Sequence, residues 1–222
     1  MSQRPRQLAL ALDHAESYAR EDFLVGPCNE GPFQLICSWP DWPANALALV
    51  GPGGSGKTHL AMIWAAMAGA RIISAQALRD AEVPSALATG ALVVEDSSAD
   101  ADDRALFHLI NLAREDNAAL LFTARSAPAT WPVAIPDLLS RLRALPVVTL
   151  QAPDDAMLRA VIVKLAADRQ LTLDESVVAF MATRIERSFA AARAAVIGLD
   201  NEALRLGRAP TRALAAEIFR AN

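Results

Sequence analysis

Eight consecutive residues have types and spacing suited to binding phosphate. They fit the pattern G-x-x-x-x-G-K-[ST] and are Gly51, Pro52, Gly53, Gly54, Ser55, Gly56, Lys57 and Thr58. In such a loop the glycines let backbone N–H groups turn toward one point, the lysine places a cation on the β- and γ-phosphates, and the hydroxyl ligates Mg²⁺. The pattern therefore predicts a site for ADP or ATP with Mg²⁺, in which Lys57 and Thr58 make the main side-chain contacts.

The segments on either side of this loop are those that the motif requires. The apolar run 46–50 predicts a short buried strand, and the alanine-rich segment 59–67 predicts a buried helix. The N-terminus of that helix adds its dipole to the site, and His59 at its start would lie beside the nucleotide. A chance glycine turn ahead of a core helix is the alternative, and the full strand–loop–helix context favours the nucleotide site.

Two carboxylates end the next strongly apolar segment, at Glu95 and Asp96 of the predicted strand 90–96. At the carboxyl edge of a parallel sheet, Glu95 could ligate Mg²⁺ and Asp96 could orient a water. The usual order of these two acids is Asp then Glu. A longer Glu95 would push the metal outward and a shorter Asp96 would reach less far, so we expect slow intrinsic hydrolysis. The alternative is a strand end capped by solvated acids.

Two further segments could contact the nucleotide. The predicted strand 118–123 ends at Thr123, whose hydroxyl could touch the γ-phosphate or the attacking water, or could simply cap the strand. Phe23, Leu24 and Val25 precede the loop and could form an apolar wall for the base. Packing of these three residues in the core is an equally good interpretation.

The composition describes an ordinary globular protein. The chain has 222 residues, of which 53% are hydrophobic and 21% charged, with a net charge of −4. This charge argues against nucleic acid as the main direct partner. No apolar run reaches membrane-spanning length and the N-terminus lacks a signal peptide, so we expect a cytoplasmic protein without membrane association. Cys28 and Cys37 lack C-x-x-C spacing and predict two reduced thiols.

The predicted elements form an α/β domain followed by helices. Strands are expected at 46–50, 71–74, 90–96, 118–123 and 147–150. Helices are expected among them at 33–40, 59–67, 75–79, 102–116 and 137–143, and beyond them at about 154–169, 174–185, 188–206 and 211–220. We therefore predict a P-loop α/β domain over 13–152 with a five-stranded parallel sheet, and a small all-helical lid over 153–222.

The start of the chain, 1–12, is expected to be a flexible tail. After a polar, proline-interrupted hexapeptide, Gln7 is followed by leucines at every second position, Leu8, Leu10 and Leu12. One interpretation is an edge strand or short helix packed on the body. The other is a short linear motif that presents the leucines to a partner's pocket, with Gln7 supplying directional hydrogen bonds. Composition leaves both open.

The phosphate loop, the acid-ended strand, Thr123, an arginine before the fifth strand and the helical C-terminal part together resemble the AAA+ family. Within that family, the segments 23–29, 51–58 and 138–142 are similar to the DnaA-like initiators. DnaA itself also carries an N-terminal interaction domain and a C-terminal helix-turn-helix domain, for which we expect no room here. With the leucine motif at its start, the chain resembles the Hda family of DnaA-related regulators over nearly its whole length.

That resemblance implies a regulator of replication initiation. Gln7, Leu8, Leu10 and Leu12 would bind the replicative sliding clamp, the β subunit of DNA polymerase III, so that DNA is reached only through the clamp. The nucleotide site would favour ADP. Docked on ATP-bound DnaA, the protein would stimulate hydrolysis there and so prevent re-initiation.

The resemblance also assigns roles to two arginines. Arg141 would be an arginine finger, used in trans against the nucleotide of DnaA, and Arg193 would be the lid's phosphate sensor. From the residues alone, Arg141 could instead pair with Asp137 on the same helix face. A stand-alone P-loop ATPase, a small-molecule kinase and a helicase-loader-type protein also stay open, as does a homo-oligomer. A kinase would require a cluster of lid arginines, whereas those present are spread along the helices: Arg184, Arg187, Arg193, Arg205 and Arg208.

Overall fold

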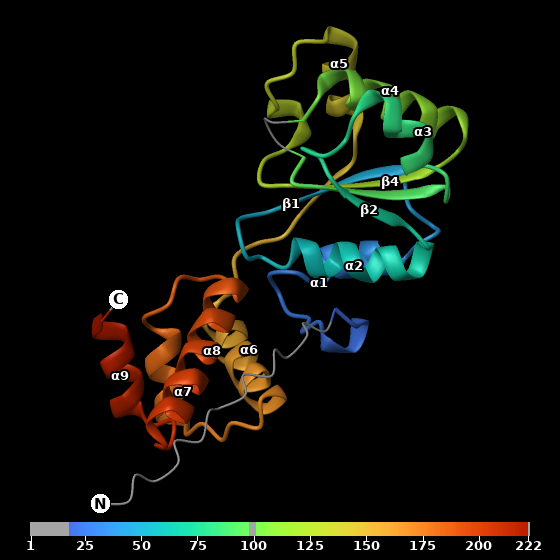
Figure 1. Ribbon diagram of the computed structural model, residues 1–222. Coiled ribbons are helices and arrows are strands. Elements are labelled where there is room, and N and C mark those ends of the chain that lie inside the picture. Colours follow the sequence, from blue (N-terminus) through green and yellow to red (C-terminus); the bar gives the residue numbers. More distant parts are fainter. Residues whose placement is uncertain (1–17, 98–100, 222) are drawn as a thin grey trace, which may run out of the picture. The chain divides into compact units, whose positions relative to one another are not determined.

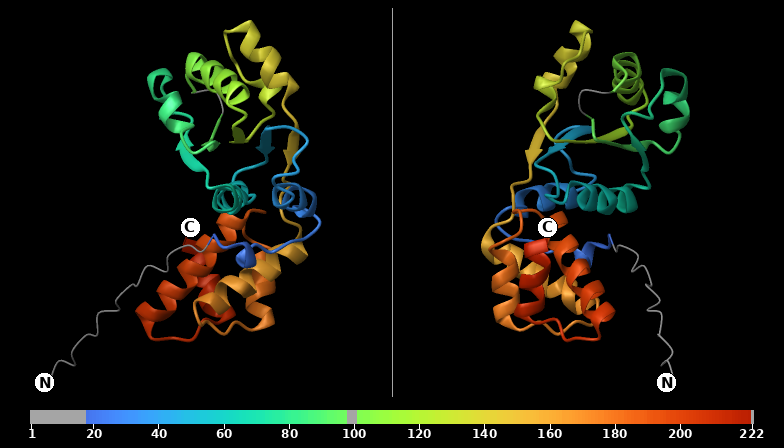
Figure 2. Two further views of the ribbon diagram at one scale, coloured as in Figure 1. Left: turned by 90° about the vertical axis from the view of Figure 1, so that its right-hand side faces the viewer. Right: turned by 60° about the vertical axis from the view of Figure 1, so that its left-hand side comes forward.

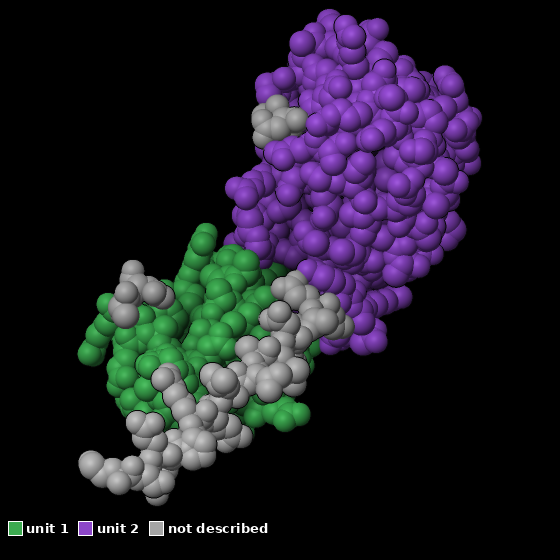
Figure 3. Space-filling model, in the orientation of Figure 1, with its two compact units in different colours: residues 1–17, 153–222 green, residues 18–152 purple. Residues whose placement is uncertain are grey.

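The computed structural model describes residues 18–97 and 101–221, which form two compact units (Figure 1, Figure 3). An α/β unit spans residues 18–152, and a helical unit begins at Pro153. The predicted partner motif at Gln7, Leu8, Leu10 and Leu12 lies outside the described residues.

A five-stranded parallel sheet is the centre of the α/β unit, with the strand order β2-β3-β4-β1-β5. The strands are β1 (Ala46–Val50), β2 (Arg71–Ser74), β3 (Ala91–Glu95), β4 (Ala119–Ala124) and β5 (Val147–Thr149). The three inner strands are almost entirely buried, as expected of strands covered on both faces. The predicted fold class, a five-stranded parallel P-loop domain followed by helices, is confirmed.

Helices cover both faces of this sheet (Figure 1, Figure 2). One face carries α1 (Glu30–Cys37) and α2 (Lys57–Ala68), and the other carries α3 (Val83–Ala86), α4 (Asp103–Glu115) and α5 (Pro136–Ala144). Because side chains alternate along a strand, Leu47 and Leu49 of β1 enter the core under α2, whereas Ala48 and Val50 enter the core under α4. Side chains therefore pack on both faces of β1, and the phosphate loop begins at the end of this buried strand.

Local sequence explains where these helices begin. Asp102 caps α4 by accepting hydrogen bonds from the N–H groups of Arg104 and Ala105, at 2.9 and 3.4 Å.

Three short 3₁₀ helices complete the unit: η1 (Arg20–Asp22), η2 (Asp80–Glu82) and η3 (Pro128–Thr130). Within the described residues Cys28 and Cys37 form no disulfide, and burial raises the pKa of Cys37, a shift that nearby Arg20 opposes.

One predicted helix is wrong. Residues 75–79 form a turn in which the N–H groups of Ala77 and Leu78 donate to the carbonyl oxygen of Ser74, and the chain then enters η2 and α3. The segment has good helix formers, but the tertiary packing of its side chains, and not local propensity, determines its conformation. Its two buried side chains, Ala75 and Leu78, instead anchor the turn in the core.

The helical unit has a core of its own. Its helices are α6 (Asp155–Asp168), α7 (Glu175–Ala182), α8 (Phe189–Leu206) and α9 (Arg212–Ala221). The core residues contributed by these helices include Leu158, Ile162, Met181, Val196 and Leu214.

Side-chain caps and one inner ion pair fix the ends of these helices. Asp154 caps α6 and Ser188 caps α8. Arg169 beyond the end of α6 pairs at 2.9 Å with Asp200 of α8, which is only 9% exposed. Within residues 18–97 and 101–221, no helix combines the length and apolar character that crossing a bilayer requires.

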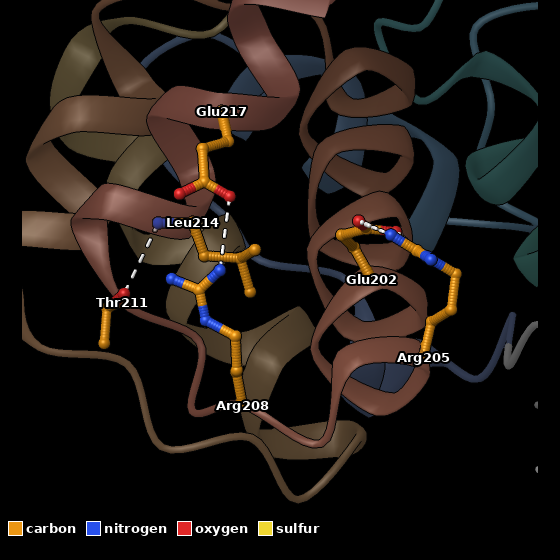
Figure 4. A network of polar contacts seen from close by, with 6 residues as sticks. All are labelled: Glu202, Arg205, Arg208, Thr211, Leu214 and Glu217. Atoms are coloured by element: carbon orange, nitrogen blue, oxygen red, sulfur yellow. Dashed lines mark hydrogen bonds and ion pairs between the residues drawn. The ribbon is translucent and has the colours of Figure 1, made fainter.

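One ion pair lies within the last turns of α8, and a second joins the residues after α8 to α9 (Figure 4). Arg205 binds Glu202 through two hydrogen bonds, of 2.8 and 2.6 Å, and these lower the pKa of Glu202. Arg208 reaches Glu217 of α9 at 3.3 Å, while the Thr211 hydroxyl accepts from an N–H in the first turn of α9. Exposed pairs of this kind add little stability, and they hold these arginine side chains at the surface of the unit.

Candidate nucleotide-binding site

The predicted phosphate loop joins the end of β1 to the start of α2. Its first residue, Gly51, donates its N–H to the carbonyl oxygen of Ala124 at 3.1 Å, so the loop starts from the β1–β4 ladder. A Cβ on Gly51 would lie 2.7 Å from the Leu150 carbonyl oxygen and 2.8 Å from the Ser55 hydroxyl, which leaves room only for glycine. Gly56 has a φ of 95°, a left-handed conformation that glycine adopts without strain.

Lys57 is the first residue of α2, and its side chain folds back over the loop. Its Nζ donates to the carbonyl oxygens of Gly51 and Pro52, both at 2.8 Å. The side chain is buried, and this desolvation lowers the pKa of Lys57. Asp96 raises that pKa, Arg125 lowers it and Glu95 raises it, so all three charges act at the loop. The ammonium is thus placed within the loop that would receive a phosphate.

The start of α2 suits an anion. The residue at the N-cap is Gly56, so no side chain caps the helix. Thr58, the predicted metal ligand, is exposed on the first turn. The positive end of the helix dipole lies at this turn, where an anion is stabilised.

The two carboxylates leave the carboxyl end of β3. Glu95 is the last residue of the strand, and its Oε1 is buried with no hydrogen-bond partner within the described residues. Asp96 follows with a φ of 53°, and its backbone N–H donates to the Thr123 hydroxyl at 3.1 Å. The carbonyl oxygen of Thr123 accepts from Ser97 at 2.8 Å, so the end of β4 supports the turn that presents both acids.

These residues fit a magnesium-bound nucleotide. Two buried polar atoms of the site, the Ser55 hydroxyl and Glu95 Oε1, have no hydrogen-bond partner in the described part of the chain. Such orphaned atoms cost free energy unless a ligand satisfies them. Among residues 18–97 and 101–221, no three His, Cys, Asp or Glu side chains could hold a metal together. Mg²⁺ held by Thr58 and Glu95 would therefore need phosphate oxygens as further ligands.

The residues predicted to lie beside the base are partly in the core. Phe23 is 8% exposed and stacks on Phe33, with ring centroids 5.4 Å apart. The His59 ring packs edge-on against Phe23 and Tyr18, and its Nε2 lies 3.1 Å from the carbonyl oxygen of Ala19. His59 therefore ties the start of α2 to the segment around η1. Contact of Phe23 or His59 with a nucleotide stays a prediction.

Asn29 organises the rest of that segment and was missed in the sequence. Its side chain is buried, accepts from the N–H of Gly26 at 2.8 Å and donates to the carbonyl oxygen of Leu24 at 2.9 Å. This pair of hydrogen bonds folds the loop that carries Leu24 and Val25, and Val25 is 45% exposed. An asparagine two residues after Gly-Pro is the signal that could have indicated such a turn.

A second residue missed in the sequence is Arg125. It directly follows β4, and its Nη2 lies 4.0 Å from the position of a Cβ built on Gly53 of the loop. The predicted strand ended at Thr123, whereas β4 continues to Ala124, which places Arg125 at the sheet edge. No local sequence pattern indicated this placement, because it depends on the pairing of β4 with β1.

The two arginines with predicted roles lie in different units. Arg141 is on α5 of the α/β unit, with its guanidinium carbon 5.3 Å from the centroid of the Phe107 ring of α4. Within the described residues it forms no ion pair with Asp137, so the stacking contact holds it instead. Arg193 is on α8 of the helical unit, and its role as a phosphate sensor stays a prediction.

The fold is shared with known replication and recombination proteins. Domain III of the Thermotoga maritima replication initiation protein DnaA superposes with a TM-score of 0.76 at 20% identity, covering 92% of this chain and 96% of that one. The chain has an AAA+ fold. Aquifex aeolicus DnaA bound to AMPPCP matches this chain with a TM-score of 0.67 at 18% identity, covering 82% of this chain and 65% of that one.

A second group of AAA+ structures is similar in architecture. A single-residue variant of Thermotoga maritima RuvB gives a TM-score of 0.72 at 15% identity, covering 90% of this chain and 71% of that one. No protein-family model matches the sequence, and neither does any curated protein. At these identities the likeness establishes the AAA+ fold alone.

Proposed function

We propose that this protein is a nucleotide-loaded AAA+ adaptor that binds the sliding clamp and stimulates ATP hydrolysis by DnaA. The observation that carries the proposal is the phosphate loop itself: the Lys57 ammonium lies within it, and Asp96 and Glu95 influence the pKa of Lys57. The AAA+ fold shared with DnaA domain III supports the replication context. ADP or ATP with Mg²⁺ is the ligand that these residues fit, and a DnaA structure with this fold contains AMPPCP.

Hydrolysis in the protein itself is proposed to be slow. In this proposal Glu95 is the metal-binding acid, and Asp96, which has a φ of 53° and donates its N–H to the Thr123 hydroxyl, is the acid that would orient a water. The shorter side chain is thus the one that would have to reach a water. A bound nucleotide that is hydrolysed slowly would then serve mainly to stabilise the folded conformation of the adaptor.

Arg141 is proposed to act on the nucleotide of a neighbouring DnaA subunit. It lies on α5, the helix directly before β5, and β5 is an edge strand of the sheet. Stacking on Phe107 restrains its guanidinium without neutralising its charge. Phosphoryl transfer spreads charge over the γ-oxygens, and a planar cationic fork stabilises that charge. In GTPases such a finger increases the rate by about 10³–10⁵.

The test is ATP hydrolysis by DnaA in the presence of clamp-loaded DNA and this protein. Wild type should stimulate hydrolysis, whereas Arg141→Ala should bind ADP and the clamp normally and fail to stimulate. Arg143→Ala, two residues along the same helix, is the matched control and should stimulate like wild type. Full stimulation by Arg141→Ala would refute the finger assignment, and loss with Arg143→Ala alone would transfer the role to that residue.

The main alternative is a P-loop ATPase that acts alone. Its lid arginines would have to serve a substrate, yet several are engaged within the helical unit. Arg187 pairs with Asp155 at 2.9 Å, and the Arg184 guanidinium carbon lies 3.7 Å from the centroid of the Phe180 ring. These contacts favour the adaptor over a small-molecule kinase. A turnover by the isolated protein in the usual enzyme range of about 1–10³ per second would favour the alternative.

A further inference from the structure

We propose that two arginines around Phe180 in the helical unit bind the phosphate backbone of DNA directly. They are Arg184, in the turn after α7, and Arg212, the first residue of α9. Because this surface belongs to the helical unit alone, the inference does not depend on the nucleotide site, on the clamp or on DnaA.

Both guanidinium groups lie against the ring of Phe180. The guanidinium carbon of Arg184 is 3.7 Å from the ring centroid, and that of Arg212 is 5.5 Å from it. Phe219 of α9 packs on the same ring, with the two centroids 6.1 Å apart, so α7 and α9 together hold the ring in place. A guanidinium that stacks on an aromatic ring keeps its full positive charge. Two cations are therefore held on one small, ordered surface.

No carboxylate neutralises these two cations within residues 18–97 and 101–221. Arg184 Nη1 donates to neutral oxygens, the Phe180 carbonyl at 3.4 Å and the Thr183 hydroxyl at 3.2 Å. The acid of α9, Glu217, is bound to Arg208 instead (Figure 4).

This lack of a partner sets the pair apart within the unit. Four of its other arginines each pair with an Asp or Glu: Arg169, Arg187, Arg205 and Arg208. Two like charges that share one ring repel each other, and an anion that binds both would remove that cost.

The position of Arg212 also indicates an anion. It lies in the first turn of α9, which contains no acidic residue. The N–H groups of a first turn carry partial positive charge, so a cation is unfavourable there and an acid is favoured. A residue that disfavours its own helix is expected at a functional surface. A phosphate at this turn would be attracted by both guanidiniums and by the end of the helix.

The charge of the chain is divided unevenly between the two units. Residues 153–222 contain ten basic and nine acidic residues, whereas residues 18–152 contain nine basic and fourteen acidic ones. The net charge of −4, which argues against nucleic acid for the chain as a whole, therefore comes from the α/β unit. The helical unit carries no such excess of acids to repel DNA.

The surface around Phe180 suits DNA better than an acidic protein. Interfaces with DNA are polar and strongly positive, whereas a protein interface has an apolar centre that becomes buried on binding. Phe180 and Phe219 are already half-buried. Arg220, in the last turn of α9, is exposed and adds a third cation to this helix. The large apolar side chains exposed in the described part of this unit lie on other helices, α6 and α8: Val163, Leu204 and Leu206.

The experiment is fluorescence anisotropy of a labelled DNA duplex titrated with the full chain at several salt concentrations. Wild type should bind, more weakly as salt rises, and equally to duplexes of unrelated sequence, because phosphates carry no sequence information. The double variant Arg184→Ala with Arg212→Ala should bind about tenfold more weakly or worse. Its slope of log affinity against log salt should be shallower by about 1.8, since each phosphate contact contributes about 0.9.

Two further variants separate the site from overall charge and from folding. Arg184→Lys with Arg212→Lys keeps both charges and should keep the slope, with an affinity between those of wild type and the alanine variant. Arg159→Ala with Arg205→Ala is the matched control, because it removes two exposed arginines of the same unit from α6 and α8, and it should bind like wild type. All variants should unfold at temperatures similar to wild type.

Three results would overturn the inference. Wild type might fail to bind the duplex at low salt, or might bind no better than the variant without Arg184 and Arg212. An equal loss in the control pair would show that overall charge, and not this surface, attracts DNA. Polyglutamate is the competitor that tests the choice of partner. If it displaced the labelled duplex as effectively as unlabelled duplex does, the surface would fit an acidic polypeptide and not DNA.

Discussion

The backbone N–H of Asp96 donates a 3.1 Å hydrogen bond to the hydroxyl of Thr123. The two residues belong to the ends of neighbouring strands, and Asp96 has a φ of 53°, which is uncommon for a residue other than glycine. Thr123 is only 2% exposed. Its hydroxyl thus supports the backbone that presents the acids, which is the strand-capping alternative for this residue; contact with a phosphate stays a prediction.

Replacing Thr123 by valine should destabilise the α/β unit. Valine has nearly the same shape but cannot accept the hydrogen bond, so the Asp96 N–H would be left without its partner at a cost of about 1–3 kcal/mol. Urea unfolding of wild type and Thr123→Val measures this cost. Thr123→Ser, which keeps the hydroxyl, is the control and should lose less. Equal stability of Thr123→Val and wild type would show that the bond contributes nothing.

Nucleotide binding should be coupled to proton uptake at alkaline pH. Burial lowers the pKa of Lys57 from its ordinary 10.5, so part of the free protein carries a neutral Lys57 below that pH. A phosphate beside the ammonium favours the charged form and raises the pKa again. Binding therefore takes up protons between the two pKa values, and affinity falls as pH rises through the lower one.

Calorimetry of ADP binding in two buffers of different ionisation enthalpy measures these protons. Lys57→Arg is the control, since an arginine stays charged over this range and should take up none. Binding by wild type without any proton uptake up to pH 10.5 would contradict the coupling and place Lys57 away from the phosphate.

The clamp should be bound through the leucines of the tail. In the double variant Leu8→Ala with Leu10→Ala, clamp binding should be abolished, because each buried leucine contributes about 1.5–3 kcal/mol. Clamp pull-down gives the binding, and thermal unfolding of the same variant is the control, with no change expected. A large loss of thermal stability would instead assign these leucines to the core of the protein.

The sequence was informative where short-range patterns determine structure. The motif 51–58 follows a strand and runs into a helix as predicted, because the glycine pattern, the apolar strand and the alanine-rich helix each need only neighbouring residues. The strand that carries the acids was predicted for the same reason, although β3 ends at Glu95, one residue before the predicted end at Asp96. The helix predicted at 75–79 is wrong because that prediction used local propensity alone, whereas burial of Ala75 and Leu78 holds the segment as a turn.

The residues that were missed depend on pairings between distant segments. Arg125 lies over the loop only because Val50 is opposite Ala124 in the sheet, and no local pattern specifies that register. Asn29 is important through hydrogen bonds to Leu24 and Gly26, whose carbonyl and N–H groups any residue would offer. The contact of Arg141 with Phe107 likewise required the packing of α5 on α4.

The most direct test of the account is the binding of ADP with Mg²⁺ to wild type and to Lys57→Ala, measured by titration calorimetry. The ammonium of Lys57 lies within the loop, 2.8 Å from the carbonyl oxygens of Gly51 and Pro52, and it is the cation on which a phosphate there would depend. Wild type should bind one ADP per chain, and Lys57→Ala should lose most of that affinity while unfolding at a similar temperature. Equal affinity of the two proteins, or no binding by wild type, would contradict the nucleotide site.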